Sequence, residues 1–210
     1  MINDWGVKEL IHRKVVICLF FGLLIGCAEV DNQPVTDVPQ VTFDEQIIVM
    51  EKAYDVMKTL ENREMTDLGE FVHPKKGLLF SPYGTVDKKR AQVFMPDQLK
   101  DLLSSKKQIE WGTEAGKGDP IRLEPEDYYK TYVYDVAFIE TDFVTYNDYY
   151  KETNSIQNVT EAFPDSNYVE FFVPGSDEFE GMDWKSLKLV FTSYKGEPYL
   201  TGIVHDQWTP

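Results

Sequence analysis

Imidazole is the side chain best suited to acid–base chemistry near neutral pH, and apart from His12 the sequence has two, His73 and His205. Asp206 follows His205 directly, and a carboxylate that orients the ring would make His205 a general base. Neighbours on a strand point to opposite faces, however, which weakens this pair. The alternative is structural: His73 stabilises a turn, and His205 forms hydrogen bonds near the end of a strand.

The residue spacing does not support a serine nucleophile, a zinc site or a calcium site. Ser81 is not in a G-x-S-x-G elbow, so nothing forces it to be an exposed nucleophile. A zinc site from the two histidines and a carboxylate would lack the H-E-x-x-H pattern. An acidic loop invites calcium but lacks the D-x-[DN]-x-[DN]-G spacing, so a solvated loop is favoured; it contains Asp177, Glu178, Glu180 and Asp183. We predict no metal and no cofactor, and we favour a protein that is not an enzyme.

Aromatic residues make up 14 % of the chain, and several fall at expected loops and strand ends. Most aromatic side chains must simply fill the core. A few amphipathic rings at such positions can instead line a binding pocket. The candidates for ligand binding are Tyr83, Trp111, His205 and Trp208.

The composition excludes several classes of protein. The chain has 210 residues, of which 42 % are hydrophobic, so it can build a sizeable core and is not disordered throughout. Its formal net charge of −15 argues against a nucleic-acid binder, which needs a basic face. Two cysteines cannot form a disulfide scaffold or a four-thiolate zinc site.

Cys27 is the residue with the clearest chemistry. Basic residues around Arg13 precede an apolar run over 15–25, which is too short to span a bilayer and has the length of a signal-peptide core. The ending Leu24-Ile25-Gly26-Cys27 resembles the bacterial lipobox. That resemblance implies cleavage before Cys27 and a diacylglyceryl group, with further acylation such as palmitate, on the cysteine.

The proposed processing divides the chain into a signal peptide over 1–26, a tether over 27–41 and one domain over 42–210. The tether carries two prolines and no aromatic residue. Two or more acyl chains give stable anchoring, and the acidic body would be repelled by anionic lipid, so the lipid holds the protein. We therefore expect a cell-membrane protein on the extracytoplasmic face, whose partner is an unidentified protein or small molecule.

Helical spacing is clearest at the start of the domain. Thr42 and Glu45 fit a capping box. An amphipathic helix of about 18 residues should follow, with an apolar stripe of Phe43, Ile47, Met50, Tyr54 and Met57 in the core. Further helices are expected at 67–72, from Pro96 with Leu99, Leu102 and Leu103 inward, and from Pro125.

The last third of the chain has strand character. We expect strands at 78–80, 109–111, 137–146, 168–173, 187–194 and 198–205, with a flexible loop over 112–120. The strongest local prediction is the hairpin that turns at Lys195-Gly196-Glu197. Helices first and strands last favour an α+β fold, with N-terminal helices packed on a curved antiparallel sheet. This order is similar to cystatin-like and NTF2-like cones, which by analogy leaves a homodimer open.

Two segments carry a family resemblance. The first is His73-Pro74-Lys75-Lys76-Gly77 followed by Phe80-Ser81-Pro82-Tyr83, and the second runs from Gly202 to Thr209 with the sequence GIVHDQWT. Together they resemble uncharacterised lipoproteins of Gram-positive bacteria over nearly all of the mature chain. No reaction is assigned to that group, so the resemblance implies a location and no mechanism.

Three functions follow as hypotheses. The leading one is a lipid-anchored domain that binds a ligand or partner in the concavity of the sheet. The second is a hydrolase or isomerase that uses His73 or His205 in the same cavity. The third is a structural surface protein without a pocket.

Overall fold

The protein's structure, a computed structural model, describes residues 43–209. Its α-helices are α1 (Phe43–Glu61), α2 (Met65–Phe71), α3 (Pro96–Leu99), α4 (Pro125–Tyr132) and α5 (Val159–Ala162). Its strands are β1 (Leu78–Ser81), β2 (Gln92–Phe94), β3 (Ile109–Thr113), β4 (Pro120–Leu123), β5 (Phe143–Tyr146), β6 (Ser166–Val173), β7 (Lys185–Tyr194) and β8 (Glu197–Gln207). No helix among these residues is long and apolar enough to cross a bilayer. The proposed lipobox, the tether and Thr42 lie outside the described residues.

One six-stranded sheet organises the domain, in the order β2-β1-β8-β7-β6-β5, beside a small β3–β4 pair. The α+β prediction is confirmed, but the prediction of a fully antiparallel sheet is wrong. Strand β1 pairs with β8 in parallel, with Leu79 opposite Gly202. The predicted β7–β8 hairpin is present, and both of its turn residues have positive φ, 55° at Lys195 and 87° at Gly196.

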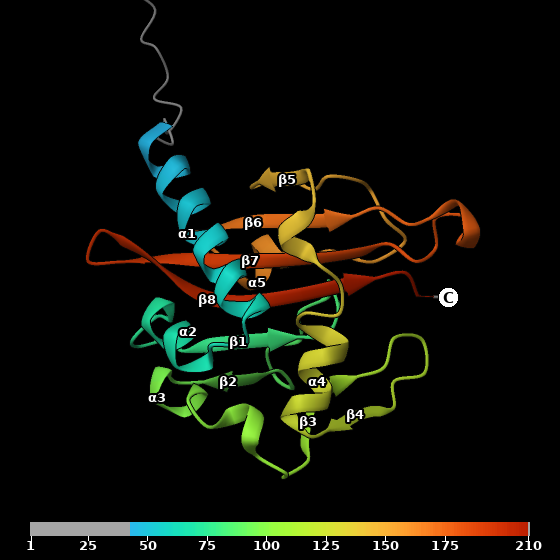
Figure 1. Cartoon of the computed structure of the whole chain (residues 1–210), viewed down its shortest axis with the longest axis horizontal. Coiled ribbons are helices and arrows are strands. Elements are labelled where there is room, and N and C mark those ends of the chain that lie inside the picture. The colour runs from blue at the N-terminus through green and yellow to red at the C-terminus, as the bar shows by residue number, and fades with distance from the viewer. Residues whose placement is uncertain (1–42, 210) are drawn as a thin grey trace, which may run out of the picture. The chain divides into compact units, whose positions relative to one another are not determined.

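Both faces of the sheet are covered. Along β7, Leu187 and Leu189 face the main core with α1 and α4, whereas Val190 faces a second cluster with α5. Figure 1 shows α1 in front of β6, β7 and β8, and α5 behind them. Burial on both sides explains why β7 is buried without interruption from Ser186 to Thr192.

The core stripe predicted for α1 is only partly correct. Ile47 is 41 % exposed, and Met50 and Tyr54 are partly buried. The fully buried residues of this helix are Val49, Ala53, Val56, Met57 and Leu60. Both stripes have helical spacing, so the contact with the sheet, and not the periodicity, decides which one is buried.

Other element boundaries also shift. The strand expected over 137–146 is a 3₁₀ turn at Phe138–Glu140 followed by the short β5. Strands β2 and β4 were not predicted, and β3–β4 shortens the loop that was expected over 112–120. Short edge strands carry little period-two pattern, so sequence alone does not distinguish them from loops.

Candidate functional site

His205 is fully buried, and both of its ring nitrogens are already engaged. Nδ1 lies 3.2 Å from the carbonyl oxygen of Pro82, and Nε2 lies 3.2 Å from Oδ1 of Asp135. Asp206 lies on the opposite face of β8 and accepts hydrogen bonds from Gln157 and from the backbone N–H of Gln207. The adjacent carboxylate therefore does not orient His205, and no ring nitrogen is free for a substrate.

Asp135 joins His205 to Lys185. Its Oδ2 lies 3.0 Å from Lys185 Nζ, and Lys185 also donates to Gln207. Burial alone would raise the pKa of the Asp135 carboxyl, but hydrogen bonds and charges from His205 and Lys185 outweigh burial and lower the pKa below its ordinary 3.8. This cluster ties β7 and β8 to the segment after α4.

We expect Asp135→Asn to lower the free energy of unfolding by about 1–3 kcal/mol at pH 7, since the buried His205 ring and the partly buried Lys185 ammonium lose their anionic partner. A lowered folded pKa adds stability above the unfolded value, near 3.8, and this stability disappears as pH falls through the folded pKa. The difference from wild type should therefore shrink below pH 4 in urea unfolding. A difference that stays constant from pH 7 to pH 3 would contradict this account. The exposed Asp55→Asn is the control.

His73 stabilises a turn. Its Nδ1 accepts the backbone N–H groups of Lys75 at 3.1 Å and Lys76 at 3.0 Å, and its carbonyl accepts the N–H of Gly77. Burial, and then the charge of Lys76, lowers the pKa of His73. Gly77 has a φ of 71°, and a Cβ there would lie 2.8 Å from the Phe94 carbonyl oxygen. The HPKKG segment thus fixes a tight turn and sets the position of Lys76.

Of the four predicted ligand-binding residues, Tyr83 and Trp111 line one small cavity of about 40 Å³, and His205 and Trp208 do not line it. Trp111 is 1 % exposed and stacks on Tyr128, with ring centroids 3.9 Å apart. Tyr83 packs edge-on against Tyr132, which also contacts the buried His205 ring. Trp208 is 38 % exposed after the end of β8. Trp111 and His205 thus present almost no surface to a ligand.

Ser81 is not an exposed nucleophile, since it is buried and its Oγ donates to the Tyr83 carbonyl oxygen at 2.8 Å. In the acidic loop, Asp183 accepts the backbone N–H of Ser176 at 2.7 Å and its hydroxyl at 2.9 Å. The backbone hydrogen bond from Ser176 is the main cause of a lowered Asp183 pKa. Among residues 43–209, no three His, Cys, Asp or Glu side chains cluster as metal ligands.

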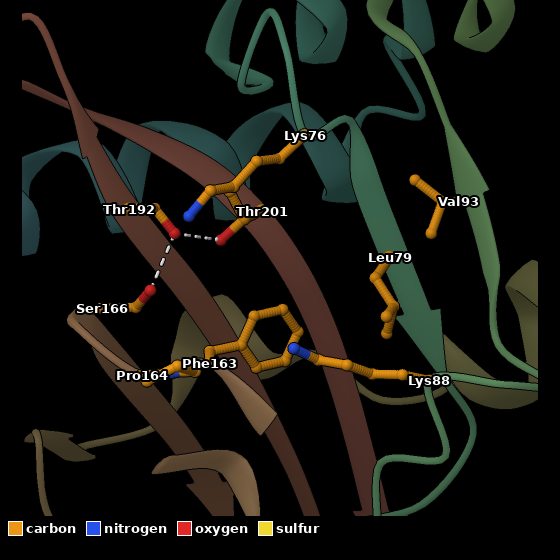
Figure 2. Close-up of a pocket in the computed structure, with 9 residues that line it drawn as sticks. All are labelled: Lys76, Leu79, Lys88, Val93, Phe163, Pro164, Ser166, Thr192 and Thr201. Atoms are coloured by element: carbon orange, nitrogen blue, oxygen red, sulfur yellow. Dashed lines mark hydrogen bonds between the residues drawn. The ribbon is translucent and has the colours of Figure 1, made fainter. Parts of the chain in front are cut away.

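A cavity of about 340 Å³ lies on the α5 side of the sheet and is lined by two lysines, so we call it the lysine pocket (Figure 2). It combines two ammonium groups, three hydroxyls and an apolar wall, and no lining residue is acidic. The lining consists of Lys76, Leu79, Lys88, Val93, Phe163, Pro164, Ser166, Thr192 and Thr201.

The three hydroxyls form a chain across strands β6, β7 and β8. Ser166 Oγ lies 2.7 Å from Thr192 Oγ1, which lies 2.9 Å from Thr201 Oγ1. Thr201 also donates to the Val190 carbonyl oxygen at 3.3 Å. Thr192 and Thr201 are buried, so central strands of the sheet hold this polar edge of the pocket in place.

The remaining walls are placed by specific local contacts. Asn158, before α5, accepts the Val86 N–H at 2.7 Å and donates to its carbonyl oxygen at 3.2 Å, which holds the loop that carries Lys88. Lys88 Nζ lies 5.2 Å from the centroid of the Phe163 ring. A Cβ at Gly202 would lie 2.7 Å from that ring, so glycine lets Phe163 lie directly on β8.

Other cavities of similar size have a different charge. One of about 350 Å³ beside α1 is lined by Asp44 and Glu45 and by no cation. Another of about 370 Å³ is lined by Tyr83, but also by Asp87 and Glu114 from loops. A third, of about 400 Å³, mixes charges of both signs. Among the described cavities, the lysine pocket stands out because its cations face no acid.

No family model, curated protein or solved structure matches this chain. The site is therefore interpreted from its geometry. Sequence reasoning missed the lysine pocket because its walls come from segments up to 125 residues apart, between 76 and 201. The HPKKG turn is the one local signal of this pocket in the sequence, because it carries Lys76.

Proposed function

We propose that this protein is a lipid-anchored extracytoplasmic lipoprotein whose α+β domain binds a small molecule in the lysine pocket. The lipobox-like ending at Cys27 supports the anchor, and the acidic composition supports a body that stays off the membrane surface. The resemblance to Gram-positive lipoproteins points to the same location.

The observation that carries the binding role is the construction of the pocket. Its hydroxyl edge lies on central strands, while its apolar wall is formed by Leu79, Phe163 and Val93. A concave site of several hundred Å³ with a few convergent polar groups is typical of small-molecule binding. The pocket lies on the α5 side of the sheet, opposite the face that packs on α1 and α4 and that core side chains fill, so we do not place the site inside a cystatin-like or NTF2-like cone.

The two other functions have less support. A hydrolase or isomerase would need a free imidazole, whereas His73 and His205 are buried and hydrogen-bonded. A structural protein without a pocket is less consistent with the cavity found here. Pairing through the sheet is likewise less favoured, because both sheet faces are packed.

Binding can be tested on the full lipoprotein in phosphatidylcholine nanodiscs, with the neutral probe 4-(trifluoromethyl)benzamide followed by fluorine NMR. We expect saturable binding to the wild type and a loss of roughly tenfold or more in Val93→Trp, because the indole fills the pocket mouth. Val93 is 47 % exposed on an edge strand, so the fold should tolerate the change. Ile156→Trp, on a site 76 % exposed and outside this pocket, is the control.

Empty nanodiscs give the background due to lipid partition. Equal saturable binding to Val93→Trp and wild type would overturn the binding role, and so would a wild type that binds neither this probe nor its charged analogue of the same shape.

A further inference from the structure

We propose that the lysine pocket selects a small organic oxyanion, a carboxylate or phosphate carried on a compact apolar body. This inference rests on the proposed binding function and specifies the chemical class of its ligand. The formal net charge of −15 does not indicate such a ligand, so the inference rests on the local charge of the pocket.

The first argument is local charge. Lys76 and Lys88 extend into the pocket from different segments of the chain (Figure 2). Within the described part of the chain, neither ammonium lies within 4.0 Å of a carboxylate. Asp87, the acid next to Lys88, instead faces Arg90 at 3.8 Å and accepts the backbone N–H of Lys89. Two cations that share a concave site without an acid favour an anion there.

The hydroxyl chain adds a set of adaptable donors. Each hydroxyl carries one proton and two lone pairs, so the chain can be ordered in either direction. With Thr201 donating to the Val190 carbonyl oxygen, Thr192 donates to Thr201 and Ser166 donates to Thr192. If Thr201 gives up this 3.3 Å bond and donates to Thr192, Thr192 donates to Ser166 and the Ser166 O–H is free to donate into the pocket. An anion near Ser166 would favour this order, and hydrogen bonds to charged groups are stronger than neutral ones. Figure 2 shows Lys76 pointing toward the same hydroxyls.

The apolar wall of the pocket indicates that the ligand carries an apolar body in addition to its oxyanion. Leu79, Val93 and the Phe163 ring face the same cavity as the ammonium groups. Inorganic phosphate or sulfate would leave this wall in contact with water and would bury no apolar area. A ligand with one oxyanion on a compact hydrocarbon or aromatic body would contact both the ammonium groups and the apolar wall.

The test compares two probes of nearly equal shape, 4-(trifluoromethyl)benzoate and the neutral 4-(trifluoromethyl)benzamide, on the full lipoprotein in phosphatidylcholine nanodiscs. We expect the benzoate to bind roughly tenfold more tightly at low salt, a difference that charge-assisted hydrogen bonds can supply. Lys76→Ala/Lys88→Ala should abolish this preference, so that this variant binds the two probes with equal affinity. Added salt should weaken only the benzoate.

Lys75→Ala/Lys89→Ala is the matched control, because it removes the same charge from the two neighbouring positions outside the pocket. Equal affinity for both probes, or equal loss in both double variants, would overturn the oxyanion inference while the binding function stands. Failure of both probes to bind overturns the binding function itself. Nanodiscs with phosphatidylglycerol should not displace the benzoate; if they do, the anion is a lipid headgroup and the assignment to a soluble ligand is wrong.

Discussion

Replacing Lys188 by methionine should lower the free energy of unfolding by about 3–5 kcal/mol, because Glu170 then stays buried without its cation. Lys188 Nζ lies 2.9 Å from Glu170 Oε1, and the two side chains are 1 % and 4 % exposed. Glu170 also accepts the Ser186 hydroxyl at 2.5 Å and the Tyr150 N–H at 2.7 Å, so it cannot turn to solvent without breaking both bonds. Urea unfolding followed by tryptophan fluorescence measures the change.

A second substitution separates the effect of charge from that of packing. Lys188→Met/Glu170→Gln should recover much of the lost stability, since glutamine keeps one acceptor oxygen and carries no charge. Lys130→Met, which removes an exposed partner of Glu126, should cost no more than about 1 kcal/mol. A double variant no more stable than Lys188→Met would show that the buried charge is not the cause.

Replacing Cys27 by serine should abolish lipid attachment completely. The thiol sulfur is the atom that would form the thioether with diacylglycerol, and a hydroxyl does not replace it in that reaction. Each buried CH₂ of an acyl chain contributes about 0.8 kcal/mol, so the loss removes the whole anchor. Growth of an expressing bacterial host with an alkyne-bearing fatty acid, followed by intact-mass measurement of the purified chain, detects the modification.

Cys18 provides the matched control for that experiment. It lies within the apolar run upstream of the expected cleavage site, so Cys18→Ser should keep both the lipid label and the processed mass. Label retained by the Cys27→Ser chain, or an unprocessed wild-type chain, would contradict the anchor and the location inferred from it.

Local sequence patterns predicted the elements that depend on nearby residues. The β7–β8 hairpin follows from Lys195-Gly196 between two apolar runs, and α4 begins at Pro125 as proline in the first turn predicts. The pairing of β1 with β8 joins residues more than 120 positions apart and leaves no local signal. The exposure of Ile47 likewise depends on where α1 meets the sheet.

The candidate site was less predictable for the same reason. The partner of His205 is Asp135, 70 positions earlier, and not the adjacent Asp206. The lysine pocket needs the HPKKG turn, the loop before β2 and three central strands, which only the folded chain brings together. The buried Glu170–Lys188 pair, outside this pocket, does leave a signal in the sequence: Lys188 lies between Leu187 and Leu189 within a hydrophobic run, which is unusual for a solvated lysine.

The central position of β8 has a consequence for the order of folding. Strands β1 and β2 reach the rest of the sheet through β8, so they have no place in it until residues 197–207 have been synthesised. Such long-range pairing delays native structure in a growing chain. A nascent polypeptide whose sheet stays incomplete until β8 has emerged would suit the export that we propose, because an incomplete domain can still be threaded through a channel and finish folding on the far side.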